Sequence, residues 1–330
     1  QDGNYSPFFI SFGLTLTLGM LIWLPFLRAR AELQTRDGFL VVTLFWTVLS
    51  IVGAFPILLT LDISFTDAVF ESVSGLTTTG ASVLTGLDQM PKSLRYYRQQ
   101  LHWLGGMGVI VLAVAILPML GIGGMQLYRA ETPGPMKEAK LTPRIAETAK
   151  ALWYVYLAVT ILCAVSFKLA GMSWFDAICH SFTTVSTGGF STHDASMAYF
   201  DSRAVDFVGS FFMIISGCSF ALLYAVWRRR SLAVFVLDPE FRFYFGLMFF
   251  YITVVSVGLW VYQVDTDPIE VFRHAIFQVA SFTTGTGLTS TDPAHWPTFL
   301  PYLLVFSSFI GGCAGSTGGG MKVVRAALVF

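Results

Sequence analysis

Three short stretches rich in Ser, Thr and Gly lie beside strongly apolar sequence and carry no charged residue. They read GLTTTGAS (75–82), TVSTGGFST (184–192) and SFTTGTGLTST (281–291). Such sequences make poor strands and poor helices, but they offer many carbonyl and hydroxyl oxygens on a backbone that Gly leaves free to bend. Rings of carbonyl oxygens can replace the hydration shell of an alkali cation. The stretches therefore indicate cation binding by backbone oxygens, with a plain polar loop as the alternative for each stretch taken alone.

The three stretches belong to one repeated pattern. The segments that align without gaps are DAVFESVSGLTTTGAS (67–82), DAICHSFTTVSTGGFS (176–191) and HAIFQVASFTTGTGLT (274–289). The last glycines of the copies, which occupy the same position, are Gly80, Gly189 and Gly287. Each copy opens with about three amphipathic turns, which predicts a short re-entrant helix before the Thr/Gly segment. The C-terminal end of such a helix directs partial negative charge at the segment, which suits a cation. The repetition favours one common architecture over three unrelated loops.

The composition indicates a membrane protein around these segments. Hydrophobic residues make up 55% of the chain and charged residues 12%, and the mean hydropathy is +0.67. Soluble domains carry about 25% charged residues. Several stretches without Asp, Glu, Lys or Arg approach or exceed the roughly 20 residues that a spanning helix needs. They are 8–26, 38–61, 101–127, 151–167, 207–227, 243–264 and 296–321. We therefore expect an all-α polytopic membrane protein built from repeated span–pore-helix–span units.

Charge sets the expected orientation and excludes other classes. Basic residues gather in the loops around 28–36, 129–150 and 228–230, which the positive-inside rule places in the cytoplasm. The Ser/Thr/Gly stretches then enter from the opposite side. Arg95 and Arg98, in one outer loop, go against this rule. The formal net charge is zero, which gives no sign of nucleic-acid binding. The four Cys form no CxxC pair, so neither disulfides nor zinc are indicated.

The apolar stretches that follow the repeats also contain glycines. WLGGMG (103–108) and IISGCS (214–219) are consistent with close helix packing, whereas FIGGCAGSTGGG (309–320) is too Gly-rich for regular helix. A kinked helix and an intramembrane loop both remain open for the third. A phosphate-binding loop is not favoured, because Met321 interrupts the GK[ST] pattern and no strand precedes it.

Four segments make the chain resemble the bacterial TrkH branch of the Trk/Ktr/HKT potassium transport superfamily over nearly its whole length. They are GLTTTGAS, STGGFSTHDAS, GGMGVIVLAVAILPMLGIGGMQLYRAETPGP and GGCAGSTGGGMKVVR. The resemblance implies four repeats around a pseudo-fourfold pore, preceded by a helix pair. It assigns a potassium-binding filter to Thr78, Thr79 and Gly80, to Thr187, Gly188 and Gly189, and to Gly285, Thr286 and Gly287.

The resemblance also gives the Gly-rich segment a role. It makes 311–320 a gating loop that obstructs the pore below the filter and moves on opening. The loop residues so assigned are Gly311, Gly312, Gly315, Ser316, Thr317, Gly318, Gly319 and Gly320. Lys322 and Arg325 follow and are expected to anchor its cytoplasmic end, with snorkelling to the membrane interface as the alternative.

From these features we expect a leading transmembrane helix at 1–36 and pore repeats at 37–130, 131–230 and 231–330. Only three filter segments are present, so the chain is expected to be a fragment whose fourth repeat lies outside this sequence. The expected function is potassium uptake across the bacterial inner membrane, with potassium as the transported ion and no organic cofactor. By resemblance, the partners are a second copy in a homodimer and a cytosolic TrkA-type nucleotide-binding regulatory subunit. The polar linker 128–147 is a candidate docking segment for that subunit, and a solvated linker is the alternative.

An enzyme is not indicated, because no HExxH motif, Ser/His/Asp set or paired acids occur within the apolar stretches. A carrier-type transporter of another small cation or substrate is the alternative function. Carriers favour broken helices and charges at mid-membrane.

Overall fold

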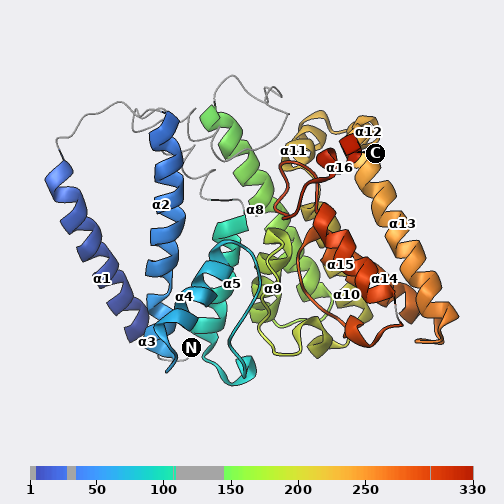
Figure 1. The fold of residues 1–330 in the computed structure, drawn as a ribbon, viewed down its shortest axis with the longest axis horizontal. Helices are drawn as coiled ribbons and strands as arrows, with labels where there is room; N and C mark the ends of the chain where they lie inside the picture. Colours follow the sequence, from blue (N-terminus) through green and yellow to red (C-terminus); the bar gives the residue numbers. More distant parts are fainter. Residues whose placement is uncertain (1–4, 28–34, 107, 109–144, 298, 330) are drawn as a thin grey trace.

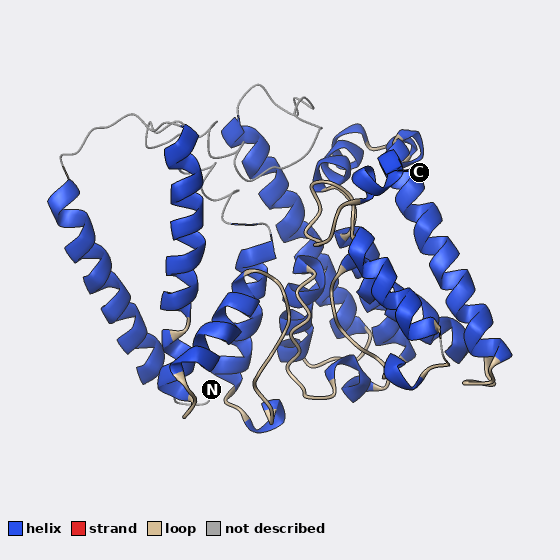
Figure 2. Ribbon diagram, in the orientation of Figure 1, coloured by secondary structure: helices blue, strands red, loops and turns tan. Residues whose placement is uncertain are grey.

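Every regular element that the structure describes is a helix. The computed structural model describes residues 5–27, 35–106, 108, 145–297 and 299–329 (Figure 1). Within these residues four helices are long and apolar enough to cross a membrane, or five when one bent pair counts as a single span. Figure 2 shows loop segments running among the helices as well as at their ends. Irregular backbone inside a membrane protein is tolerated where other protein segments or water satisfy its polar groups.

Long apolar helices occupy most of the predicted stretches and run much of the height of the molecule in Figure 1. They are α1 (Ser6–Trp23) with the 3-10 turn η1 (Leu24–Phe26), α2 (Thr35–Gly53), α8 (Ile145–Leu169) and α13 (Pro239–Val261). The stretch 38–61 is not one helix, because the chain restarts after Ala54 as α3 (Phe55–Thr60). Pro56 fits the first turn of the new helix, where its missing N–H has no partner to lose. Most of the stretch 101–127 lies outside the described residues.

Three shorter helices coincide with the repeated pattern, as predicted: α4 (Phe65–Leu76), α9 (Trp174–Ser186) and α14 (Pro268–Thr284). Each begins at a side chain that caps the free N–H groups of its first turn. Ser64 and Ser173 accept from the N–H of the Asp three residues later at 3.1 Å, and Asp267 accepts from Ile269 N at 3.0 Å. The hydroxyls of the two serines also donate to those Asp side chains, which completes reciprocal caps.

The three short helices also end in the same way. A left-handed residue closes each helix, and these residues are Thr78, Thr187 and Gly285, with φ of 52°, 53° and 73°. The next N–H then returns to a carbonyl of the last helical turn, as Thr79 N to Ser74 O, Gly188 N to Thr183 O and Thr286 N to Ser281 O at 2.8–2.9 Å. Such turns satisfy carbonyls that the helix leaves free. They also fix the direction in which each Thr/Gly segment leaves its helix.

A returning helix follows each Thr/Gly segment: α5 (Lys92–Gly106), α10 (Arg203–Ser216) and α15 (Leu300–Ile310). Each short helix packs against the returning helix of its own repeat, and α9 and α14 also pack against the returning helix of the preceding repeat. The remaining elements are η2 (Leu87–Gln89), η4 (Ser196–Phe200), α11 (Phe220–Arg229), α12 (Ala233–Leu237), η5 (Pro293–His295) and α16 (Val323–Val329).

Two apolar stretches depart from the prediction of continuous spans. The stretch 207–227 forms α10 and α11, which meet at 95° across Gly217. The sequence predicted close packing at this glycine, and a Cβ there would indeed lie 2.9 Å from the Thr284 side chain, but the break was not predicted. The stretch 296–321 is helical only over α15, and Gly311 ends that helix with φ of 76°. The structure therefore gives a loop rather than a kinked helix after Ile310.

The apolar core is divided unevenly. One large cluster joins α8, α9, α10, α13, α14 and α15 through buried residues such as Phe167, Met213 and Phe277. A small second cluster consists of Ala54, Ile57, Ala68 and Leu94 around α3, α4 and α5. The second and third repeats therefore share a core, whereas the first repeat meets them mainly through α5 and α9.

Candidate functional site

The three Thr/Gly segments meet, and their aligned glycines lie against one another. A Cβ placed on Gly80 would lie 2.1 Å from the carbonyl oxygen of Gly188, and one placed on Gly189 would lie 2.4 Å from that of Thr286. A Cβ on Gly287 would lie 3.9 Å from the Cα of Gly189. The φ angles of the aligned glycines are 77°, 98° and 80°. Gly80 and Gly189 are therefore required by both space and backbone angle, and Gly287 by backbone angle.

The contacts follow one rule around the site. The carbonyl before Gly189 faces Gly80, and the carbonyl before Gly287 faces Gly189. The second and third segments thus lay the same carbonyl against the glycine of the preceding repeat. Thr79 is the matching residue in the first repeat. The structure brings together the aligned glycines and the residues just before the second and third of them, while Thr78, Thr187 and Gly285 form the turns that end the short helices.

Threonine hydroxyls orient two of the segments. Thr77 donates to Val73 O and Thr284 donates to Ala280 O, both at 2.7 Å. Thr77 lies 2.8 Å from the hydroxyl of Thr79, and Thr284 lies 2.6 Å from that of Thr286. A hydroxyl has one hydrogen, so Thr79 and Thr286 must be the donors in these pairs. The second repeat has Gly188 at this position and lacks the pair.

A buried polar residue in each short helix holds the segment that follows the glycine. Glu71 accepts from Ser82 Oγ at 3.0 Å, and Nε2 of His180 lies 3.0 Å from Ser191 Oγ. In the third repeat Gln278 donates to Thr291 O at 2.7 Å. All three helix residues are fully buried. Their role was not predicted from the sequence, although they occupy one aligned position in otherwise largely apolar helices.

We call the contact of α5 with residues 188–192 the first junction. Arg95 donates to Thr192 O at 3.1 Å, and Arg98 donates to Ser191 O at 3.4 Å. The Arg98 guanidinium also lies 4.2 Å from the centre of the Phe190 ring. Both arginines are buried. Their position explains the exception to the positive-inside rule, because they bind backbone oxygens inside the protein instead of facing the outer solvent.

His102, one turn further along α5, completes the first junction. A Cβ on Gly188 would lie 2.2 Å from its Nδ1, so the imidazole sits directly against the second Thr/Gly segment. The same nitrogen lies 3.2 Å from the hydroxyl of Thr183, which accepts from Gly189 N at 2.8 Å. The ring stacks on Phe190 with centroids 4.0 Å apart. His102 therefore belongs to the packing behind the second segment.

We call the contact of η4 and α10 with the third segment and α14 the second junction. Met197 N and Ala198 N both donate to Thr289 O, at 3.0 and 3.2 Å. Ser196 Oγ accepts from Thr289 N at 3.2 Å. The donors to the carbonyl are main-chain groups, whereas the first junction uses arginine side chains.

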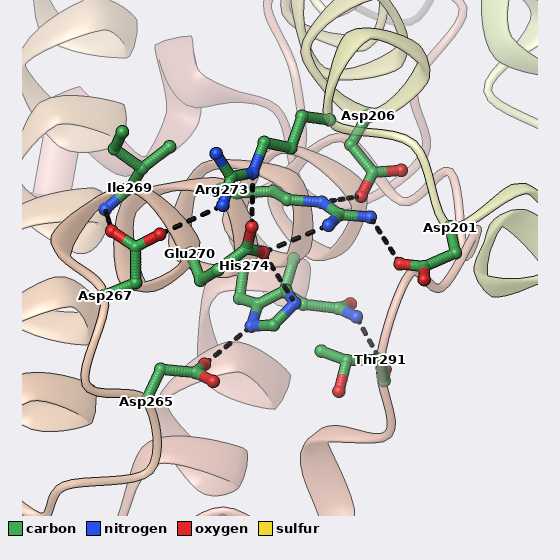
Figure 3. Close-up of polar contacts among 11 residues, drawn as sticks. Asp201, Asp206, Asp265, Asp267, Ile269, Glu270, Arg273, His274 and Thr291 are labelled. Atoms are coloured by element: carbon green, nitrogen blue, oxygen red, sulfur yellow. Dashed lines mark hydrogen bonds and ion pairs between the residues drawn. The ribbon is translucent and has the colours of Figure 1, made fainter.

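A network of charges joins α10 to the first turns of α14 at the second junction (Figure 3). Arg273 donates to Asp206 at 2.7 Å and to Glu270 at 3.0 Å. Arg203 donates to Asp267 at 2.9 Å and also binds Glu270. Arg273 and Asp206 are buried, with side chains 8% and 1% exposed. The network fixes the N-terminal end of the helix and does not touch the glycine of its segment.

The Gly-rich segment 311–320 leaves α15 and docks into the break between α10 and α11. Cys313 N donates to Gly217 O at 2.8 Å, and Phe220 N donates to Gly315 O at 3.0 Å. The loop therefore satisfies backbone groups that the broken helix leaves free. At its base a Cβ on Gly320 would lie 2.8 Å from the Cα of Gly311, so only small residues allow the two ends to meet.

The far part of this loop contacts the ends of two short helices. The Thr317 hydroxyl is 3.0 Å from Val185 O in the last turn of α9 and 3.3 Å from Ser216 O in α10. A Cβ on Gly318 would lie 2.8 Å from Thr284 O, and one on Gly285 would lie 3.8 Å from Gly319 N. The loop therefore lies next to the turns that lead into the Gly189 and Gly287 segments.

Three charged residues stand near the ends of the loop. Lys322 donates from Nζ to Gly318 O, so this expected anchor binds the loop itself. Arg325 is exposed in α16. Glu240, which sequence analysis did not select, accepts from Ala314 N at 2.6 Å from the first turn of α13. Nothing in the sequence near Glu240 marks it, because the contact joins residues far apart in the chain.

A titratable contact joins the outer loops of the first two repeats. Nδ1 of His193 hydrogen-bonds Asp88, and Nε2 lies 3.4 Å from Asp176. Gly86 N donates to Asp194 at 3.0 Å beside this contact. Burial disfavours the charged form of His193, but the two neighbouring carboxylates outweigh burial and raise its pKa above the usual 6.5. The hydrogen bond from His193 lowers the pKa of Asp88.

Comparisons with known proteins identify the family of this chain. A family model described as TrkH, cation transport protein, matches residues 5–330. The chain belongs to this family. It is 54% identical over its full length to the Trk system potassium uptake protein TrkH of Halomonas elongata, covering 68% of that protein. It is 51% identical to the TrkH of Escherichia coli strain K12, covering 69% of that protein.

A solved structure shows the same fold. The crystal structure of the potassium transporter TrkH from Vibrio parahaemolyticus matches with a TM-score of 0.87 and 52% sequence identity, over 100% of this chain and 68% of that one. The chain is therefore a multi-pass membrane protein of the TrkH cation transport family. Membership of this family makes it a transport protein rather than an enzyme.

Proposed function

We propose that this chain serves potassium uptake across the bacterial inner membrane, and that backbone oxygens around Gly80, Gly189 and Gly287 bind the ion. The observation that carries the proposal is the meeting of three aligned glycines at the ends of three equally capped helices. The C-terminal ends of those helices add partial negative charge at the same place. Relatives that share half of the sequence carry the name potassium uptake protein.

The chemistry of the segments supports selection by geometry. The stretches 75–82, 184–192 and 281–291 contain no Asp or Glu, so no formal negative charge from them faces the ion. Discrimination then depends on how many carbonyl oxygens replace water and on how they are spaced. Residues that hold the spacing matter as much as residues that supply oxygens.

We further propose that the loop 311–320 is the gate. It lies against the last turn of α9 and the end of α14, and eight of its ten residues are Gly, Ser or Ala, which can change backbone angles at little steric cost. The hydrogen bonds of Thr317, the Ala314–Glu240 contact and the Lys322–Gly318 contact hold the closed position. Opening requires these few contacts to break while the filter stays in place.

The wider assembly is part of the proposal. We propose a leading helix at 1–36, pore repeats at 37–130, 131–230 and 231–330, and a fourth repeat outside this sequence that completes the ring. We also propose a homodimer and a cytosolic TrkA-type nucleotide-binding regulatory subunit. The linker 128–147, its candidate docking segment, lies almost wholly outside the described residues. Co-purification of the full-length protein with such a subunit, with and without the linker, tests that partnership.

Ion flux through the full-length protein in lipid vesicles tests the function. We expect potassium and rubidium to pass faster than sodium and lithium, since backbone oxygens at fixed spacing suit the larger ions. Equal flux of all four ions would refute the filter. A carrier-type transporter of another small cation or substrate is the alternative, and flux that saturates with that substrate but not with potassium would support it.

A further inference from the structure

The guanidinium of Arg98 hydrogen-bonds residues of two Thr/Gly segments at once: a side chain of the first and a carbonyl of the second. Its Nε donates to Glu71 Oε1 at 2.7 Å, and one terminal nitrogen donates to Ser82 Oγ at 3.0 Å. The other terminal nitrogen donates to Ser191 O at 3.4 Å. Ser82 and Ser191 occupy the same place in their repeats, two residues after Gly80 and Gly189. One side chain therefore joins matching points of the first and second segments.

Glu71, the partner of Arg98, is buried and accepts several hydrogen bonds. The Glu71 carboxylate accepts from Arg98, from Ser82 Oγ at 3.0 Å and from Val83 N at 3.3 Å. The side chains of Arg98 and Glu71 are 1% and 0% exposed. Removing two charges from water is costly, so a buried pair persists only when each group is fully hydrogen-bonded. The planar fork of arginine can reach three partners in different directions, which a lysine ammonium cannot match.

The other described repeats lack this link. His180 and Gln278, which align with Glu71, bind the segment of their own repeat, and within the described part of the chain they form no hydrogen bond to the segment of a neighbouring repeat. Continuing the alignment of 103–108 with 214–219 back along the helices places Gly209 at the position of Arg98. At the second junction, main-chain groups of η4 take over the carbonyl that matches Ser191 O.

We propose that Arg98 is a positioning residue that sets ion selectivity by fixing the distance between the first and second filter segments. This inference rests on the proposed potassium filter and assigns a residue outside the filter to its selectivity. Glu71 orients Arg98, and Arg98 transmits the position of α4 to the segment that follows Gly189. Without the link, the two segments keep their own helices but lose their fixed spacing, and carbonyl spacing is what discriminates potassium from sodium.

The test compares buried pairs at the two junctions in the full-length protein. The double variant Glu71→Gln/Arg98→Gln removes both charges, so that neither remains buried without a partner. The matched control is Asp206→Asn/Arg273→Gln, which removes a buried pair that touches no filter segment. Potassium and sodium fluxes in vesicles give the selectivity ratio, and the thermal unfolding midpoint in detergent reports folding.

We expect the first-junction variant to lower the potassium-to-sodium ratio about five- to tenfold, the factor that one or two hydrogen bonds are worth. The control variant is expected to keep the wild-type ratio. Arg98→Lys keeps the charge beside Glu71 but not the fork, so its unfolding midpoint is expected to stay near wild type while its ratio falls.

Two results would overturn the inference: a wild-type ratio in Arg98→Lys and in the first-junction variant, or an equal loss in the control. If the double variant yields no folded protein, Arg98→Lys decides the question alone. Wild-type protein without any preference for potassium would instead refute the proposed filter, so the two failures are distinguishable.

Discussion

At the first junction, buried arginine side chains of α5 donate to the backbone that follows Gly189. At the second junction, main-chain N–H groups of η4 donate to the backbone that follows Gly287. The same type of segment is therefore held in place by two kinds of donor. Main-chain donors do not depend on which side chains occupy η4, whereas the first junction depends on particular residues.

The two junctions also differ in where their buried ion pairs lie. The first junction places its buried ion pair, Glu71 with Arg98, directly behind the filter segments. The second junction places its pair, Asp206 with Arg273, in a network at the N-terminal end of α14 (Figure 3). Substitutions at the first junction are therefore expected to change selectivity, and substitutions at the second to change stability.

The largest effects are expected at the aligned glycines, where the three Thr/Gly segments meet. Gly80→Ser and Gly189→Ser each place a side chain within 2.1–2.4 Å of a carbonyl oxygen at positive φ, so the segments must move apart. We expect both variants to lose selective potassium flux altogether. Gly287→Ser places its Cβ at an ordinary contact distance of 3.9 Å from Gly189 and carries only the backbone penalty. That penalty is about 1–2 kcal/mol, so this variant is expected to conduct while admitting sodium. The ion flux per folded molecule distinguishes the three variants. Equal fluxes in all three would contradict the described packing of the glycines.

The next effect concerns stability at the second junction. Arg273→Gln leaves Asp206 buried without its cationic partner, and breaking such a pair costs about 3–5 kcal/mol. We expect a marked fall in the unfolding midpoint, with the potassium-to-sodium ratio of the remaining folded protein unchanged. Adding Asp206→Asn is expected to restore part of the stability. A changed ratio in the folded fraction would mean that the two junctions are not different in function.

A smaller effect is expected where the loop 311–320, the proposed gate, contacts α9 and α10. Thr317→Val keeps the side-chain shape and removes the hydrogen bonds to Val185 O and Ser216 O. These bonds are worth about 1 kcal/mol together, which corresponds to about a fivefold shift toward the open loop. Potassium flux per molecule is expected to rise with unchanged selectivity. Ser316→Ala is the control, because the Ser316 hydroxyl bonds only to Cys313 O within the loop. Equal flux in Thr317→Val and wild type would argue against a gate.

The Thr/Gly segments were the part of the site most open to prediction from sequence. Gly80, Gly189 and Gly287 align without gaps, and a glycine required at the same place in three copies indicates a backbone constraint that no other residue meets. The short helices followed from the same pattern, although their N-terminal caps were not predicted. Local sequence was sufficient here, because caps, turns and left-handed residues depend on neighbours within a few positions.

The supports behind the filter were not predictable in this way. Arg98 and Glu71 lie on different helices, and their pairing depends on how α5 rotates against α4. The charge of Arg98 instead looked like an exception to the positive-inside rule. The break at Gly217 escaped prediction for a related reason, since a packing glycine and a helix break look alike in sequence. The helix can break at Gly217 because the N–H of the loop residue Cys313 donates to the Gly217 carbonyl that the break leaves free.

The smallest expected effect is a pH dependence at the outer side of the first junction. The pKa of His193 is raised in the folded protein, so its contact with Asp88 contributes stability fully below about pH 6.5 and loses it as pH rises through the folded pKa. The pKa of Asp88 is lowered, so its contribution to stability is present above its usual pKa of 3.8. This contribution disappears as pH falls through the folded pKa. The contact is therefore strongest in mildly acidic solution. Partial exposure of Asp88 limits it to about 1 kcal/mol.

Comparing wild type with His193→Gln across pH measures this contribution directly. The difference in unfolding midpoint is expected to be largest near pH 5–6, between the two usual pKa values, and to shrink toward alkaline pH as the imidazole loses its proton. His295→Gln is the matched control, because His295 and its partner Asp292 are 86% and 63% exposed and such pairs contribute little. A difference for His193→Gln that stays constant across pH would show that packing against Tyr199, whose ring stacks on the imidazole at 3.5 Å, is what holds the outer loops together rather than charge.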